Sequence, residues 1–198
     1  MGGRGGRAVQ QRAVTARRSD DGPLTWNVAG LLADDPGADR VFEIESAAIE
    51  LGEDLRLAQP IDGRVRLLRT NRGILAHADL TAALALECSR CLREIDFPVE
   101  IRFQEEYLPA LDMATGRPLP TDEEPDVARL DDHHELDLET PVREAIQLAE
   151  PIAPLCRPDC PGLCIVCGLP LEEGDHDHPV DDIDPRLEAL RGFTPDDG

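Results

Sequence analysis

The chain has 198 residues, a net charge of −21 at pH 7, and a composition that is 41% hydrophobic but only 3% aromatic. This length suits one domain of ordinary size, and the sequence shows neither an apolar run long enough to span a membrane nor the apolar core of a secretory signal. We therefore expect a cytoplasmic protein with no membrane partner. In a reducing compartment its six cysteines are expected to be metal ligands or catalytic groups rather than disulfides.

The charge is distributed unevenly along the chain. Residues 1–18 carry five arginines and no acidic residue, and subtracting these five positive charges leaves −26 for the rest of this acidic protein. We predict that residues 1–22 form a disordered Gly/Arg-rich tail, which either contacts phosphate groups or has no role. Residues 23–198 are predicted to be a single domain, whose acidic surface repels bare RNA and suits a basic protein partner.

Alternating apolar residues predict a β region over residues 23–108. The stretch WNVAGLL and the turn DDPGAD lead into a first strand at 40–45. Residues 63–70 then pair with 74–88 as a hairpin across the turn at Asn71, Arg72 and Gly73. The second hairpin strand places these residues on one face: Ile74, Ala76, Ala78, Leu80, Ala82, Leu84 and Leu86.

The strongest alternation lies in residues 93–104. Pro98 falls on the polar face and indicates an edge strand. The apolar face carries Ile95, Phe97, Val99, Ile101 and Phe103. Because the strands follow one another without an intervening helix, we predict an α+β, mainly β fold. It is an antiparallel sheet or partly open barrel with one packed helix and a C-terminal metal-binding segment.

The second half of the chain is predicted in three parts. Residues 109–135 are Pro-rich and acidic, which predicts an exposed loop. Residues 136–178 hold a helix and a Cys/His cluster, and 179–198 form an acidic segment with a short amphipathic stretch at 184–190. The helix is expected to use Thr140 as its cap and to stop at Pro151. Its apolar stripe is Val142, Ala145, Ile146 and Ala149.

Cysteine and histidine spacing predicts metal binding. The candidate ligands are Cys88, Cys91, Cys156, Cys160, Cys164, Cys167, His176 and His178. Eight ligands suffice for two tetrahedral sites, and thiolate and imidazole groups suit structural Zn²⁺, so one or two ions are expected. The alternatives are unpaired or redox-active thiols, and solvated histidines in the polar stretch Asp-His-Asp-His. His133 and His134 are expected to be surface residues.

Several motifs resemble the YceD family, the large ribosomal RNA subunit accumulation proteins. In sequence order they are NVAGLL, PGADR, LECSRCL, DLETPVREAIQLAEPIAPLCRPDCPGLCIVCG and DPRLEAL. The resemblance spans residues 26–191 and leaves out the Arg-rich tail and the length of the acidic loop. It implies a bacterial cytoplasmic factor, without known enzymatic activity, that supports accumulation or maturation of the large-subunit (23S) ribosomal RNA.

The resemblance also implies how the ligands divide. Relatives with a reduced C-terminus keep the first cysteine pair together with a Cys or His pair at positions 156 and 160. This implies one site made of Cys88, Cys91, Cys156 and Cys160. Many relatives have Cys-x-Cys where this chain has two histidines, so a second site would use Cys164, Cys167, His176 and His178. A ribbon that pairs Cys88 and Cys91 with Cys164 and Cys167 remains the competing division.

Three classes of function fit the sequence. The first is a non-enzymatic ribosome biogenesis factor that contacts ribosomal RNA or a pre-ribosomal particle through Arg90, Arg93 and Arg157. The bland alternative is that these arginines offset thiolate charge. The second is an acidic binding module or chaperone for a basic ribosomal protein. The third, a zinc hydrolase or thiol oxidoreductase, is disfavoured because cysteine-rich sites are normally closed and no phosphate-binding or nucleophile motif is present. No small-molecule substrate or catalytic residue is expected.

Overall fold

The computed structural model describes residues 22–112, 115–119, 127–174, 176–178 and 185–190. The predicted N-terminal tail lies outside the described residues apart from Gly22, as do parts of the acidic loop and most of the acidic C-terminal segment. Pro185–Leu190 forms a short 3-10 helix, η1, within the predicted amphipathic stretch. Among the described helices, none combines the length and apolar character that crossing a bilayer requires.

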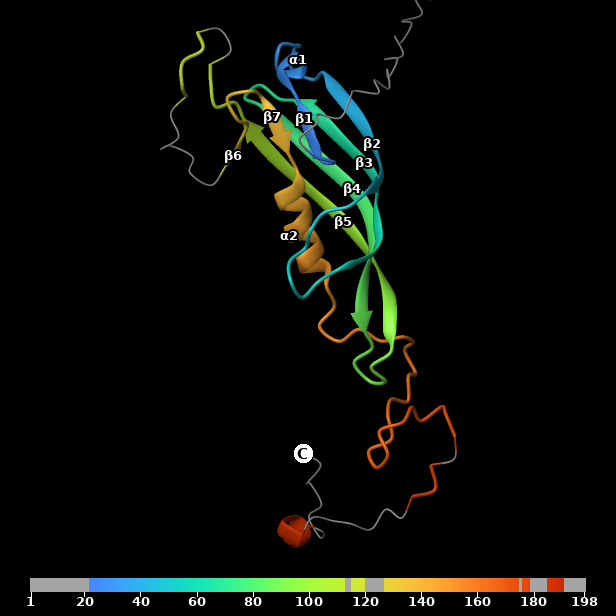
Figure 1. Cartoon of the computed structure of the whole chain (residues 1–198). Helices are drawn as coiled ribbons and strands as arrows, with labels where there is room; N and C mark the ends of the chain where they lie inside the picture. Colours follow the sequence, from blue (N-terminus) through green and yellow to red (C-terminus); the bar gives the residue numbers. More distant parts are fainter. Residues whose placement is uncertain (1–21, 113–114, 120–126, 175, 179–184, 191–198) are drawn as a thin grey trace, which may run out of the picture.

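A five-stranded sheet forms the body of the protein (Figure 1). Its strands are β2 (Asp39–Ala47), β3 (Leu57–Arg69), β4 (Ile74–Glu87), β5 (Glu94–Leu108) and β6 (Ala128–Arg129). The first four pair in chain order as an antiparallel meander, and β6 adds to β5 in parallel. Because β2 and β6 are its two ends, the sheet is open rather than closed into a barrel. The predicted α+β, mainly β class is confirmed.

The hairpin of β3 and β4 forms where the sequence predicts it. Arg69 pairs with Ile74 across the turn, and the hydroxyl of Thr70 accepts hydrogen bonds from the backbone N–H groups of Arg72 and Gly73. Only glycine fits at position 73, because a Cβ there would lie 2.0 Å from the carbonyl oxygen of Tyr107. The sequence signal for this turn therefore reflects a close approach between two strands.

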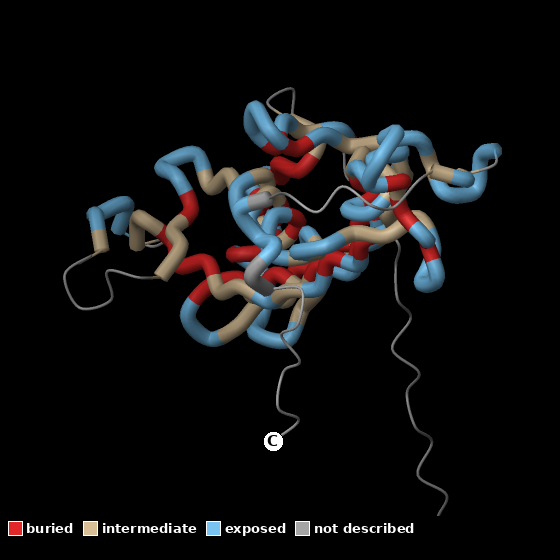
Figure 2. Tube along the Cα trace, turned by 90° about the horizontal axis from the view of Figure 1, so that it is seen from below, coloured by how far each residue is buried: buried red, intermediate tan, exposed pale blue. Residues whose placement is uncertain are grey.

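One face of the sheet is covered by a second layer. It consists of β1 (Thr25–Asn27) paired with β7 (Glu135–Asp137), the single-turn helix α1 (Ala29–Leu32) and the longer helix α2 (Glu139–Ala149). Figure 1 shows these elements on the same side of the sheet, and Figure 2 shows the buried residues gathered between the layers.

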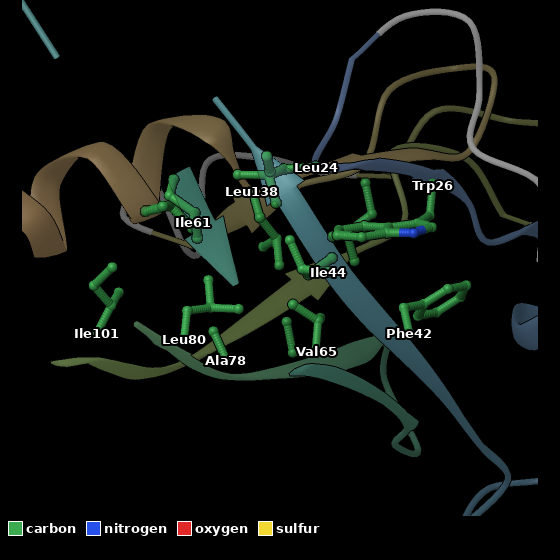
Figure 3. Close-up of a cluster of buried hydrophobic side chains, with 14 of the residues drawn as sticks. Leu24, Trp26, Phe42, Ile44, Ile61, Val65, Ala78, Leu80, Ile101 and Leu138 are labelled. Atoms are coloured by element: carbon green, nitrogen blue, oxygen red, sulfur yellow. The ribbon is translucent and has the colours of Figure 1, made fainter. Parts of the chain in front are cut away.

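Aliphatic side chains fill the space between the two layers, as Figure 3 shows. Val65, Leu80 and Ile101 rise from the sheet, and Leu24 and Leu138 lie opposite them in the covering layer. Trp26 and Phe42 pack at one end, with ring centroids 5.1 Å apart. Alternate residues of each strand point into this core because side chains in a strand alternate between its two faces.

Helix α2 begins earlier than predicted. It starts at Glu139, and the carboxylate of Asp137 accepts the Glu139 N–H at 2.9 Å, whereas Thr140 lies inside the first turn. The expected cap was wrong because an acidic residue two positions before the helix already satisfies that free N–H group. The predicted end is correct, since Glu150 turns to an extended conformation before Pro151.

The segment predicted as an exposed loop is partly ordered against the sheet. It contains β6 and an isolated bridge between Leu111 and Pro118. Leu130 is only 2% exposed, so the end of this segment contributes to the core. The strand β6 pairs only with Tyr107 and Leu108 at the end of β5. Among the described strands, β5 therefore has no outer partner at Pro98, as an edge strand requires.

Candidate metal centres

The first cluster joins two distant parts of the chain. Cys88 and Cys91 lie in the turn between β4 and β5, which projects beyond α2, and Cys156 and Cys160 lie in the segment after α2 (Figure 1). A hydrogen bond of 2.8 Å from the Ser89 N–H to the carbonyl oxygen of Pro154 holds the segment against the turn. The four sulfur atoms lie within 4.8 Å of one another.

The sulfur spacing fits a tetrahedral zinc ion. The Sγ atoms of Cys88 and Cys160 are 3.8 Å apart, as are those of Cys91 and Cys156. Four sulfurs at the usual Zn–S distance of about 2.3 Å would be separated by about 3.8 Å, whereas a disulfide would bring two of them to about 2.05 Å. All six cysteines are free thiols. Cys88 and Cys160 are fully buried, so this set leaves little room for a further ligand.

Backbone donors and burial set the thiol pKa values in the first cluster. The backbone N–H of Cys156 is the strongest influence on Cys88 and, with those of Arg90 and Cys91, lowers its pKa to about 6 despite its burial. Burial and the neighbouring thiols raise the pKa of Cys156 to about 12, and burial raises that of Cys160. A dication bound among the four sulfur atoms would offset the repulsion between their negative charges and favour the thiolate form.

Each Cys-x2-Cys turn, which we call a knuckle, has the same backbone hydrogen bonds. In the first, the Cys88 N–H donates to the Arg93 carbonyl, and the Leu92 N–H donates to the Cys88 carbonyl. In the second, the Cys164 N–H donates to the Leu169 carbonyl, and the Gly168 N–H donates to the Cys164 carbonyl.

Both knuckles also turn through one residue with positive φ. Leu92 has φ 56° and Gly168 has φ 73°. Glycine takes this conformation at no steric cost, whereas a leucine there is strained. In the second knuckle the backbone N–H groups of Cys167 and Val166 lower the pKa of Cys164 to about 6. The two turns are therefore built alike despite their different sequences.

Two histidines complete the second cluster. The Nδ1 atom of His176 lies 3.6 Å from the Sγ atom of Cys167, and its Nε2 atom lies 3.0 Å from the Pro170 carbonyl. A sulfur and a nitrogen bound tetrahedrally to one zinc ion would be about 3.6 Å apart. When the Nε2–H donates to Pro170, Nδ1 is free to bind a metal, as second-shell bonds usually arrange.

The orphaned nitrogen of His178 supports the same interpretation. Its Nε2 atom is buried and has no hydrogen-bond partner, and the possible ligand atoms of Cys164, Cys167, His176 and His178 lie within 4.8 Å of one another. Buried polar atoms are rarely left without a partner. A metal ion bound at this nitrogen would supply one. The structure thus brings the eight predicted ligands together in the two groups that the family resemblance implies.

The three predicted RNA-contacting arginines all have partners inside the protein. Arg90 donates to the Cys160 carbonyl at 2.8 Å. Arg93 and Arg157 both pair with Glu172, at 3.9 Å in the case of Arg93. Glu172 follows the second knuckle, so these contacts connect the segments that carry the two clusters. Sequence reasoning missed this role of Glu172, for which there was no local signal.

Two of the three histidines outside the clusters, His133 and His134, directly precede β7. His133 is exposed, as predicted. His134 is half-buried rather than on the surface, and its carbonyl accepts the Val28 N–H at 2.9 Å. Position 134 has φ 61°, which lets the chain turn into β7. Its role is structural because its backbone fixes the start of α1 against that strand.

The fold and the two clusters define a mainly β domain with a four-cysteine group at the tip of the β4–β5 hairpin and a second group, of two cysteines and two histidines, in the segment that follows α2. The sequence profile of the family described as "Large ribosomal RNA subunit accumulation protein YceD" matches residues 76–194, which include all eight clustered residues. The chain belongs to this family, as the motifs predicted.

Mycobacterial proteins are similar over nearly the whole chain. One from Mycobacterium tuberculosis strain H37Rv is 35% identical over 189 residues, which cover 92% of this chain and 86% of the relative. One from Mycobacterium leprae is 31% identical over 184 residues, covering 89% and 80%. Both carry the description "Uncharacterized protein". No solved structure shows significant similarity.

Proposed function

We propose that this protein is a non-enzymatic ribosome biogenesis factor of the cytoplasm that supports accumulation or processing of the 23S ribosomal RNA and contains two structural zinc ions. The observation that carries the proposal is the family membership, because the matched region, residues 76–194, holds both clusters. The clusters then explain how a small hairpin tip without a core of its own keeps a defined shape.

Each zinc ion would have four protein ligands. Cys88, Cys91, Cys156 and Cys160 would bind one ion, and Cys164, Cys167, His176 and His178 the other. When bound, zinc would cross-link the chain and neutralise the thiolates. A site that has four protein ligands lacks the open position that a hydrolytic zinc needs, which supports a structural role. The first ion would fix the tip of the β4–β5 hairpin to the segment after α2.

Direct RNA contact by Arg90, Arg93 and Arg157 stays a prediction. Their internal partners, the Cys160 carbonyl and Glu172, favour a role in holding the two clusters together. A large acidic surplus and few aromatic side chains also give little support for base stacking or phosphate binding by the body of the protein. The factor would then act on the RNA through a pre-ribosomal particle or a protein that binds it.

The function is tested by deletion of the gene in its host, with the ratio of 23S to 16S ribosomal RNA and the sucrose-gradient profile of the subunits as measurements. We expect the deletion to lower 23S RNA and the large subunit. Wild-type protein and the exposed-site control His133→Ala should restore both, and the double variant Cys88→Ser/Cys91→Ser should not. An unchanged RNA ratio in the deletion strain would refute the proposal.

The charge favours a second candidate, an acidic chaperone for a basic ribosomal protein. Outside residues 1–18 the chain has a net charge of −26, and such a field attracts basic proteins at long range. Binding to purified basic ribosomal proteins that weakens steeply with salt, without binding to 23S RNA, would select this candidate.

A further inference from the structure

The second knuckle presents aliphatic side chains to solvent at its outer end. Ile165 is 96% exposed, Val166 58% and Leu169 55%. The first two are the residues between Cys164 and Cys167, and the Leu169 carbonyl accepts the Cys164 N–H at 2.8 Å. These three residues therefore belong to one tight loop, which we call the knuckle tip. Exposed aliphatic groups gathered in this way mark interaction sites more often than single exposed ones do.

The knuckle tip is held in a fixed shape. Its loop is closed by the two backbone hydrogen bonds at Cys164, and Gly168 supplies the positive φ that the turn needs. The ion pairs from Glu172 to Arg93 and Arg157 connect it to the first cluster. A surface that is already ordered loses little conformational entropy on binding.

The surroundings of the knuckle tip are acidic. Residues 156–178 contain one arginine and five acidic residues. The arginines that reach this segment are already engaged: Arg157 by Asp159 and Glu172, Arg93 by Glu172, and Arg90 by the Cys160 carbonyl. Phosphate groups are repelled by such a surface, and aliphatic side chains offer no platform for base stacking. A second copy of a chain with charge −21 is repelled as well. A basic polypeptide that carries aliphatic side chains complements both properties.

We propose that the knuckle tip is a docking site for a basic protein segment in which aliphatic residues alternate with lysine or arginine. Aliphatic side chains of the partner pack on Ile165, Val166 and Leu169, and its cations are attracted by the exposed carboxylates of the same segment, Glu173 and Asp177. The inference rests on the proposed assembly function, because it names the class of partner through which the protein reaches the pre-ribosomal particle.

The test uses the full-length protein, purified under reducing conditions without chelator, and fluorescence anisotropy of labelled probes. The first probe is a synthetic peptide of lysine and leucine, the second has the same charge but serine in place of leucine, and the third is an oligouridine. The variant is Ile165→Ser/Val166→Ser, which keeps all eight clustered residues. The matched control is Leu148→Ser, which changes an exposed leucine on α2.

We expect wild type and Leu148→Ser to bind the lysine–leucine peptide equally and the double variant to bind it at least about tenfold more weakly, as loss of two buried aliphatic side chains requires. Equal binding by the double variant, equal binding of the serine peptide, or no binding by wild type would overturn the proposal. Oligouridine binding that the double variant weakens would assign the knuckle tip to RNA instead. The assembly function is judged separately, because restoration of 23S RNA by wild-type protein does not depend on any of these probes.

Discussion

The sulfur and nitrogen geometry makes a quantitative prediction for X-ray absorption at the zinc edge. A regular tetrahedron with edges of 3.8 Å, the Sγ–Sγ distance in the first cluster, has its centre about 2.3 Å from each corner. Six cysteines and two histidines around two ions average to three sulfurs and one nitrogen per zinc. We expect sulfur at about 2.3 Å and nitrogen at about 2.0 Å in this ratio.

Removal of one cluster should change the average in a defined way. In Cys164→Ser/Cys167→Ser the zinc content should fall from two ions to one, and the remaining ion should have four sulfurs and no nitrogen. In Cys88→Ser/Cys91→Ser the surviving ion should have two sulfurs and two nitrogens. Native mass spectrometry gives the zinc content, and circular dichroism shows whether each variant keeps its sheet.

The ligand atoms seen at the zinc edge can refute this reasoning. A nitrogen ligand that persists in Cys164→Ser/Cys167→Ser would show that a histidine binds the other ion. The same result is what the competing ribbon of Cys88 and Cys91 with the second knuckle predicts, because Cys156, Cys160, His176 and His178 would then hold the surviving ion. Oxygen ligands in the wild type would show that a site is open to water, which a closed structural site excludes.

The remaining predictions concern the sheet. Gly63 has φ 140°, and a Cβ there would lie 2.4 Å from the Asp79 carbonyl oxygen, so Gly63→Ala should lower the free energy of unfolding by about 2–4 kcal/mol. The control Gly52→Ala is also at positive φ but in open space, and it should lose only about 1 kcal/mol of unfolding free energy, measured by urea denaturation. Equal losses in the two variants would contradict the clash at Gly63. Burial and the Glu105 carboxylate raise the pKa of Tyr107 well above its usual range, so the unfolded chain releases the phenolic proton first and stability should fall as the pH rises above about 10. Tyr107→Phe should lose about 1–2 kcal/mol of unfolding free energy at pH 7, because the Tyr107 hydroxyl donates to Glu105 at 2.9 Å. The stability of this variant should fall less steeply at alkaline pH than that of the wild type. An unchanged slope would count against the assignment of the pH dependence to Tyr107.

Much of the sheet can be predicted from the sequence because strand patterns are local. Alternation along β4 and β5 identifies the core face, and Gly73 marks the turn before β4. Side chains in a strand face opposite sides with a period of two residues, so a short stretch suffices. The start of α2 was missed because its first N–H is satisfied by Asp137. This residue is the last one of the preceding strand β7, so it gives no sign in the sequence of a helix cap.

Cysteine spacing by itself determined that the chain carries two knuckles and enough ligands for two tetrahedral sites. Only the tertiary structure decided which ligands meet, because that depends on the path of the chain after α2. The hydrogen bond from Ser89 to Pro154 holds the turn between β4 and β5 against the segment after α2. Cys91 thereby meets Cys156, 65 positions further along the chain, and Cys88 meets Cys160, 72 positions further along. The internal partners of the arginines beside the clusters depend on the same long-range docking. A local pattern encodes which residues can bind a metal, whereas their convergence at one point is a property of the whole fold.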